Sequence, residues 1–163
     1  MMPSRQAVAA IALGVSGLAL GGAWFAENIL GLVPCALCLL ERWPFRVVLA
    51  VSALALIWKL ARRPLLALAL LAMLAGVGLG ATHVGVEQHW WPSPLPECAA
   101  PAFGGGSIAD RLARMPARPA KPCDEAVLLI PSVPVSFAAL QLVLALVMSV
   151  LLATSVLQTE LST

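Results

Sequence analysis

The sequence predicts an all-α membrane protein, a four-helix transmembrane bundle formed by one domain over residues 1–163. Hydrophobic residues make up 61% of the chain and charged residues only 11%, whereas soluble domains carry about 25% charged residues. The apolar residues also gather in four long blocks, which is typical of helices that cross a bilayer. The formal net charge of +2, without a basic stripe carrying interleaved aromatic residues, argues against a nucleic-acid partner.

The four blocks define the expected spans, at residues 6–26, 43–60, 64–83 and 135–157. A helix rises about 1.5 Å per residue, so each block can cross a core of about 30 Å, the second only just. Pro131 and Pro134 place the start of the last helix near Val135, because proline disrupts a helix interior. A cleaved signal peptide is the alternative for the first block, but its apolar run exceeds the roughly 7–15 residues usual in such a segment.

The order of the connections places all the cysteines on one side of the membrane. With four spans, residues 27–42 and 87–134 share a face, and they contain Cys35, Cys38, Cys98 and Cys123. The short segments on the other face, residues 1–5, 59–63 and 158–163, are dense in arginine and lysine, which is typical of the cytoplasmic side. We therefore expect cytoplasmic termini and cysteines in the periplasm or an equivalent oxidising compartment, where disulfides persist.

The second connection on the cysteine side is predicted to contain a short amphipathic helix. In "SIADRLARM", Ile108, Leu112 and Met115 recur at helical spacing, with charged residues on the opposite face. Ser107 is a favourable N-cap residue. We expect this helix to lie on the membrane surface, and a brief exposed helix within a loop is the alternative.

Four cysteines on one face are compatible with a zinc site, two structural disulfides or two redox-active pairs. Zinc is disfavoured because Cys98 and Cys123 are 25 positions apart, whereas zinc sites usually repeat the short Cys-x-x-Cys spacing, so no metal site is predicted. A structural disulfide suits Cys98 and Cys123, and closing that loop would contribute about 3–4 kcal/mol. It suits Cys35 and Cys38 poorly, because so small a ring restrains little chain.

The segment around Cys35 and Cys38 favours redox chemistry. A Cys-x-x-Cys pair commonly has a lowered thiol pKa, and Cys38 lies near the expected start of the second helix, where the helix dipole favours a thiolate. Arg42 is four residues further on the same helical face, where it would stabilise that thiolate or an anionic reduced acceptor, with Glu41 holding it in place. A lipid-soluble quinone is the acceptor that suits this location, because it reaches helix ends from within the membrane.

The stretch "PCALCLLERWPF" resembles the signature of the DsbB-type disulfide bond formation proteins, in which Pro-Cys-x-x-Cys is followed by a Glu-Arg pair. Four spans, a second cysteine pair in the second periplasmic loop, "WPSPLPEC" before the third cysteine and "CDE" at Cys123 agree with the same family. The resemblance covers nearly the whole chain. It implies a multi-pass protein of the bacterial inner membrane.

The resemblance also implies a mechanism, that of a thiol:quinone oxidoreductase. Such proteins reoxidise a soluble periplasmic oxidase of the DsbA type, which has a thioredoxin fold, and pass the electrons to ubiquinone or menaquinone. Carried over to this chain, the partner's thiolate attacks Cys98, and the released Cys123 attacks Cys35. Cys38 is then freed beside the quinone, and the Cys35–Cys38 bond is restored as quinol leaves. Each transfer is thiolate attack through a mixed disulfide.

Three residues are expected on the quinone side of the site. Arg42 matches the family's quinone-side arginine, and Glu41 matches the acid beside it. The family often has a histidine near the quinone, and His83 is favoured over His89 because it lies closer to the end of the third span. An ordinary interfacial histidine is the alternative for either.

Two other functions stay open on the sequence alone. A vitamin K epoxide reductase-like quinone oxidoreductase shares the four helices and the Cys-x-x-Cys pair, but that family usually carries the pair at the start of the last helix of its bundle. A non-enzymatic membrane protein with two structural disulfides is the alternative from another class. In that case the Cys35–Cys38 bond would persist through any redox challenge.

Overall fold

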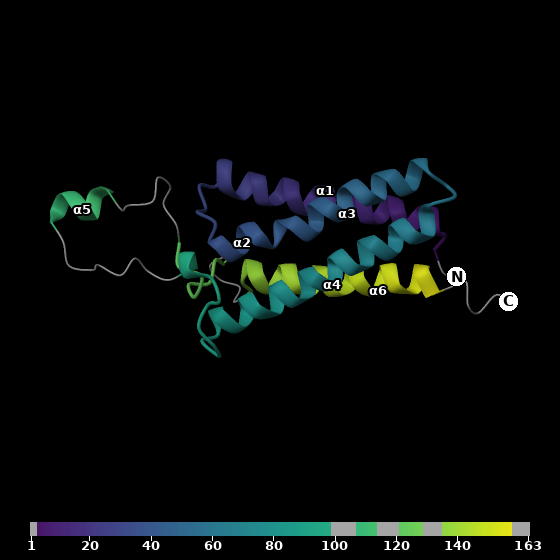
Figure 1. Ribbon diagram of the computed structural model, residues 1–163. Coiled ribbons are helices and arrows are strands. Elements are labelled where there is room, and N and C mark those ends of the chain that lie inside the picture. The colour runs from purple at the N-terminus through teal and green to yellow at the C-terminus, as the bar shows by residue number, and fades with distance from the viewer. Residues whose placement is uncertain (1–2, 99–106, 114–120, 129–134, 158–163) are drawn as a thin grey trace.

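The computed structural model of the protein describes residues 3–98, 107–113, 121–128 and 135–157. Within these ranges the chain is helical, and its β structure is limited to an isolated antiparallel bridge between Leu128 and Ser136. Four long helices lie side by side and form the body of the molecule (Figure 1): α1 (Arg5–Asn28), α3 (Arg42–Ile57), α4 (Arg62–Glu87) and α6 (Phe137–Leu157). Three short helices complete the fold: α2 (Ala36–Leu40), η1 (Pro96–Cys98) and α5 (Ile108–Ala113).

Three of the long helices, α1, α4 and α6, are long and apolar enough to cross a membrane. Within the described residues the helical fold and three candidate membrane spans are thus confirmed, whereas α3 has only 16 residues and its crossing stays a prediction. The helix ends at Ile57 rather than near residue 60, because the Arg62 Nε group donates a hydrogen bond of 2.8 Å to the carbonyl of Ala55 and the chain turns there. The last helix begins at Phe137, two residues later than expected, because the Ser136 hydroxyl accepts the N–H of Ala139 as a cap.

Close packing places α4 between α3 and α6. A Cβ atom on Gly76 would lie 3.2 Å from Pro44 of α3, and one on Gly80 would lie 3.2 Å from Leu142 of α6. Small residues allow helix backbones to approach closely, as is common within membranes. The core between the long helices is built from fully or almost fully buried apolar side chains, including Val8, Ala12, Phe45, Val48, Leu66, Met73, Met148 and Leu152.

The two ends of the bundle are formed by different segments of the chain. At one end the Arg5 Nε group donates to the carbonyl of Ser155 over 3.3 Å, so the start of α1 lies beside the end of α6, with the α3–α4 turn close by (Figure 1). At the opposite end lie α2, η1 and the end of α4. The described parts of the two connections that contain cysteines are therefore together at one end, as the order of the spans predicts.

The short helix predicted in the second long connection is present as α5. Its start is a capping box, in which the Ser107 hydroxyl accepts the Asp110 N–H at 3.2 Å and the Asp110 carboxylate accepts the Ser107 N–H at 3.1 Å. Figure 1 shows α5 beyond the end of the bundle that carries the cysteines. Ile108 is exposed, whereas Met115, the last residue of the expected apolar face, lies outside the described residues. Contact of α5 with the membrane surface stays a prediction.

Candidate active site

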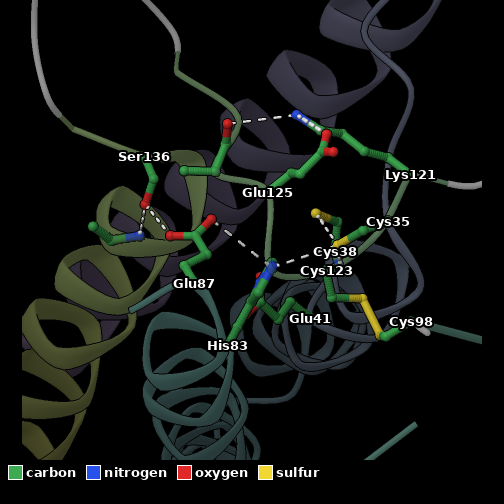
Figure 2. Close-up of polar contacts among 12 residues, drawn as sticks. Cys35, Cys38, Glu41, His83, Glu87, Cys98, Lys121, Cys123, Glu125 and Ser136 are labelled. Atoms are coloured by element: carbon green, nitrogen blue, oxygen red, sulfur yellow. Dashed lines mark hydrogen bonds and ion pairs between the residues drawn. A yellow bond between two sulfur atoms is a disulfide. The ribbon is translucent and has the colours of Figure 1, made fainter. Parts of the chain in front are cut away.

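Cys35, Cys98 and Cys123 lie in one buried cluster at the end of the bundle, and the half-buried Cys38 packs against it (Figure 2). Cys98 and Cys123 form a disulfide, whereas Cys35 and Cys38 are free thiols whose sulfur atoms are 2.7 Å apart. Leu37 packs in the same cluster, together with Val86 of α4. The two pairs, distant in sequence, are therefore parts of one packed unit, as exchange between them requires.

The first pair is positioned by the start of α2. Pro34 precedes Cys35, which has an extended backbone and caps the helix, and its sulfur accepts the N–H of Cys38 at 3.1 Å. The first N–H groups of a helix have no partner within the helix, and here a cysteine sulfur takes the role of the usual hydroxyl or carboxylate. Because Cys35 is the cap and Cys38 lies in the first turn of α2, both thiols belong to one helical turn.

The start of this helix favours the thiolate of Cys35 rather than that of Cys38. The hydrogen bond shared with the Cys38 thiol and the hydrogen bond from the Cys38 N–H lower the pKa of Cys35, and they outweigh its burial. The same shared hydrogen bond, together with burial, raises the pKa of Cys38. In this dithiol state the hydrogen bond between the thiols and the Cys38 N–H both stabilise the Cys35 sulfur, and the Cys38 thiolate expected from the sequence stays a prediction.

His83 of α4 connects this cysteine pair to two buried carboxylates (Figure 2). Its Nε2 atom lies 3.5 Å from the sulfur of Cys35, and its Nδ1 atom lies 3.0 Å from Oε1 of Glu41. Glu87, one turn further along α4, lies 4.0 Å from Nε2 and accepts a hydrogen bond of 2.6 Å from the hydroxyl of Ser136. His83 therefore lies within the site, whereas His89 is exposed after the end of α4.

Arg42 forms an ion pair with Glu27, and not with Glu41 as expected. Its Nη2 atom donates to Oε1 of Glu27 at 2.6 Å, while the carboxylate of Glu41 faces His83. The expected contact fails because adjacent residues of a helix point in different directions, so Glu41 and Arg42 face different neighbours. Glu27 lies in the last turn of α1.

Sequence reasoning missed Glu27, Glu87 and Ser136. Glu27 follows directly after a long uncharged run, and Glu87 is four residues after His83 in the same helix. A carboxylate at the end of an uncharged span, and a carboxylate one helical turn after a histidine, are sequence signals that could have identified Glu27 and Glu87. Ser136 reaches Glu87 across 49 positions, and no local pattern predicts that contact.

A small hollow of about 50 Å³ lies beside Cys38, between the cysteine-side ends of α1, α3 and α6. Apolar side chains form much of its wall, among them Val33, Pro34 and Phe137. The polar residues that line it are Cys38, Glu27, Glu41, Arg42 and Gln141. The hollow thus combines apolar walls with one thiol and one fixed guanidinium.

A larger cavity of about 490 Å³ lies beside Cys98. It is lined in part by Trp90, Trp91 and Asp124, and the Trp91 indole donates to the carbonyl of Thr82 at 3.1 Å. Cys98 itself is buried and forms part of the wall of this cavity. The two cysteine pairs therefore border different spaces.

The sulfur atoms of Cys35 and Cys38 and a nitrogen of His83 lie within 4.8 Å of one another. This is the group within the described ranges that is compact enough to hold a metal ion. The same two sulfur atoms are also close enough to react with each other, and a disulfide between them would remove both thiolate ligands.

The family model described as "Disulfide bond formation protein DsbB" matches residues 4–155 of the 163 in this chain. The matched range includes both cysteine pairs, Arg42, Glu41 and His83. Searches of curated proteins and of solved structures found no match. With both cysteine pairs packed together at one end of the bundle and the match over nearly its whole length, the chain belongs to the DsbB family of disulfide bond formation proteins.

Proposed function

We propose that the protein is a thiol:quinone oxidoreductase that reoxidises a DsbA-like dithiol oxidase in the periplasm and passes the electrons to ubiquinone or menaquinone. The family indicates a disulfide-generating membrane oxidoreductase. The observation that carries the finer proposal is the arrangement of the cluster, which borders the cavity beside Cys98 on one side and the hollow beside Cys38 on the other. One side would admit a soluble protein thiol, and the other a membrane-soluble acceptor.

The proposed topology has four spans, with both termini in the cytoplasm of a bacterial inner membrane. The helix α3 rises about 24 Å over its length, and α2 continues it towards the cysteine end. Because α3 packs against both α1 and α4, it would cross the bilayer with them. The positive-inside rule supports this orientation, since Arg5, Arg62 and Arg63 belong to the end opposite the cysteines.

The electron path begins at the disulfide between Cys98 and Cys123. A thiolate of the partner attacks Cys98, forms a mixed disulfide with it and releases Cys123 as a thiolate. Cys123 packs in the cluster with Cys35 and attacks that sulfur when Cys35 and Cys38 are joined. Cys38 then leaves as the thiolate that faces the hollow. The partner's second thiolate next attacks the mixed disulfide and releases Cys98, and Cys98 attacks Cys123, which restores the Cys98–Cys123 bond and leaves both Cys35 and Cys38 reduced.

The residues around Cys38 fit a quinone head group. Apolar walls accept the ring and its isoprenoid tail, and Gln141 and Arg42 provide hydrogen-bond donors for ring oxygens. The ion pair with Glu27 holds the guanidinium at the hollow. A hollow of about 50 Å³ does not enclose a whole ring, so much of the molecule would lie in the lipid. The quinone, when bound, supplies a two-electron, two-proton acceptor.

The test is quinone reduction by the purified protein in detergent, with a reduced DsbA-like oxidase as electron donor. We expect donor-dependent reduction in the native chain and none in Cys38→Ser. A matched control is Cys98→Ser, which should lose reduction from the protein donor but keep it with dithiothreitol, because that small dithiol can reduce Cys35 and Cys38 directly. No reduction of either quinone type, with a Cys35–Cys38 bond indifferent to the donor, would instead favour a structural membrane protein.

A further inference from the structure

The two thiols of the first pair differ in their access to the acceptor. Oxidation of a dithiol to a disulfide releases two protons with two electrons, and reduction of a quinone to a quinol takes up two of each. Among the described residues, Cys38 lines the hollow and Cys35 does not. Its proton can pass into the hollow directly, whereas the proton of Cys35 needs a carrier.

A continuous chain of contacts joins Cys35 to the hollow by a second route (Figure 2). The sulfur of Cys35 lies 3.5 Å from Nε2 of His83, and the opposite ring nitrogen lies 3.0 Å from the carboxylate of Glu41. Glu41 in turn lines the hollow. An imidazole can accept a proton at one nitrogen and release one at the other, so thiol, imidazole and carboxylate are arranged as a proton-conducting series.

The series is shielded from water. Cys35, His83 and Glu41 are each 2% exposed. The titratable groups facing His83 are Glu41 from the α2–α3 junction, Glu87 from its own helix, and Cys35 and Cys38 from the α2 turn. Buried ionic groups are costly unless they are paired, and the two carboxylates offset the charge of a transient imidazolium.

We propose that His83 and Glu41 form a proton relay from the Cys35 thiol to a quinone bound beside Cys38. The proposal rests on the proposed function. As the S–S bond forms, the two thiols lose two electrons and two protons, and the quinone becomes a quinol. The Cys38 proton enters the hollow directly. The Cys35 proton enters His83 at Nε2, an equivalent proton leaves Nδ1 for Glu41, and Glu41 passes it on. Between turnovers Nε2 releases its proton through Glu87 to the solvent and Nδ1 takes up one from the solvent through Glu41, so the ring recovers its starting tautomer with no net change in protons.

The first test uses no quinone. In a Cys98→Ser/Cys123→Ser background, the ultraviolet absorbance of the thiolate reports ionisation of the remaining pair. We expect His83→Gln to move the first ionisation to higher pH, because the thiol loses its proton acceptor. His89→Gln, which alters the other histidine, should leave the titration unchanged. An unchanged titration in His83→Gln would contradict the first step of the relay.

The second test is a single turnover of the same reduced background protein with a short-chain ubiquinone. Glu41→Gln keeps the shape of the side chain but cannot carry a proton, so we expect reduction to slow roughly 100-fold. The quinone concentration at half-maximal rate should change far less, and Glu41→Asp should recover part of the rate. Because the two groups act in series, the double variant Glu41→Gln/His83→Gln should be no slower than the slower single variant.

These measurements distinguish failure of the proposed function from failure of the proton relay. If the background protein, with His83 and Glu41 intact, does not reduce quinone, the proposed function fails and the relay fails with it. If it reduces quinone, but both single variants keep its rate or their effects multiply in the double variant, the relay is wrong and the oxidoreductase stands.

Discussion

Cys35 and Cys38 share one helical turn, whereas Cys98 and Cys123 join two segments that are 25 positions apart. The first pair contacts a histidine and borders a small hollow lined by an arginine, and the second borders a cavity about ten times larger that is lined by tryptophans. The surroundings of the first pair adjust thiol ionisation, whereas the second pair borders an open space. In the proposed function, the quinone-side step would therefore depend on local electrostatics, and the partner-side step would depend on access to Cys98.

The largest effect expected at the second pair is that of Cys123→Ser. In this variant Cys98 has no disulfide to exchange, so turnover with the partner should stop. A mild oxidant then joins the Cys98 thiol to the partner's thiol, and the adduct should accumulate because no Cys123 thiolate can displace the partner. Non-reducing electrophoresis after mild oxidation measures it. The double variant Cys98→Ser/Cys123→Ser is the control that should form no adduct. Absence of an adduct in Cys123→Ser would contradict the proposed order of exchange.

Arg42→Ala tests the electrostatics of the first pair. Removing a hydrogen-bonding charge typically costs about 1.5–3 kcal/mol, so quinone use should weaken roughly 10–100-fold. Exchange of Cys98 and Cys123 with the partner should persist. Arg46→Ala is a matched control, because Arg46 stacks over Trp43 at 5.2 Å and does not line the hollow. Steady-state kinetics with varied quinone concentration would measure both variants. Equal kinetics in Arg42→Ala and Arg46→Ala would show that Arg42 has no role in quinone use.

The two thiols of the first pair should ionise at different pH values. Because hydrogen bonds from Cys38 lower the pKa of Cys35, its thiolate should form below the pH at which an ordinary thiol ionises, and it should be lost as the pH falls through that lowered value. The second ionisation should occur above the ordinary value, because the pKa of Cys38 is raised. Thiolate absorbance in the Cys98→Ser/Cys123→Ser background measures both steps. A single step at the ordinary thiol pKa would show that the two sulfurs do not interact.

The smallest effect concerns the tryptophan wall of the larger cavity. The ring of Trp91 packs directly against Gly85, where a Cβ atom has no space. Gly85→Ala should therefore displace Trp91 and slow exchange with the partner by a factor of a few, while reduction of quinone with dithiothreitol as donor stays unchanged. Gly78→Ala on the same helix meets nothing within 4 Å and serves as the control. Equal partner kinetics in both variants would show that this wall does not matter for docking.

Local sequence patterns predicted the helices well and the contacts among them poorly. The helices α1, α4 and α6 lie close to the expected spans, and α5 begins at its predicted cap, because apolar blocks and capping residues act within one element. The end of α3 was missed because Arg62, from the next helix, caps it. The partner of Arg42 was missed because it depends on how the end of α1 meets the start of α3.

The sequence by itself determined that this is a helical membrane protein with a Cys-x-x-Cys pair beside a helix start, because hydropathy and residue spacing act over a few turns of chain. Tertiary structure alone decided which groups meet. His83 reaches Glu41 across 42 positions and Cys35 across 48. Both cysteine pairs also join one cluster. These contacts arise when α4 packs between α3 and α6, and the rotation of each helix about its axis is set by its neighbours, which no local pattern records.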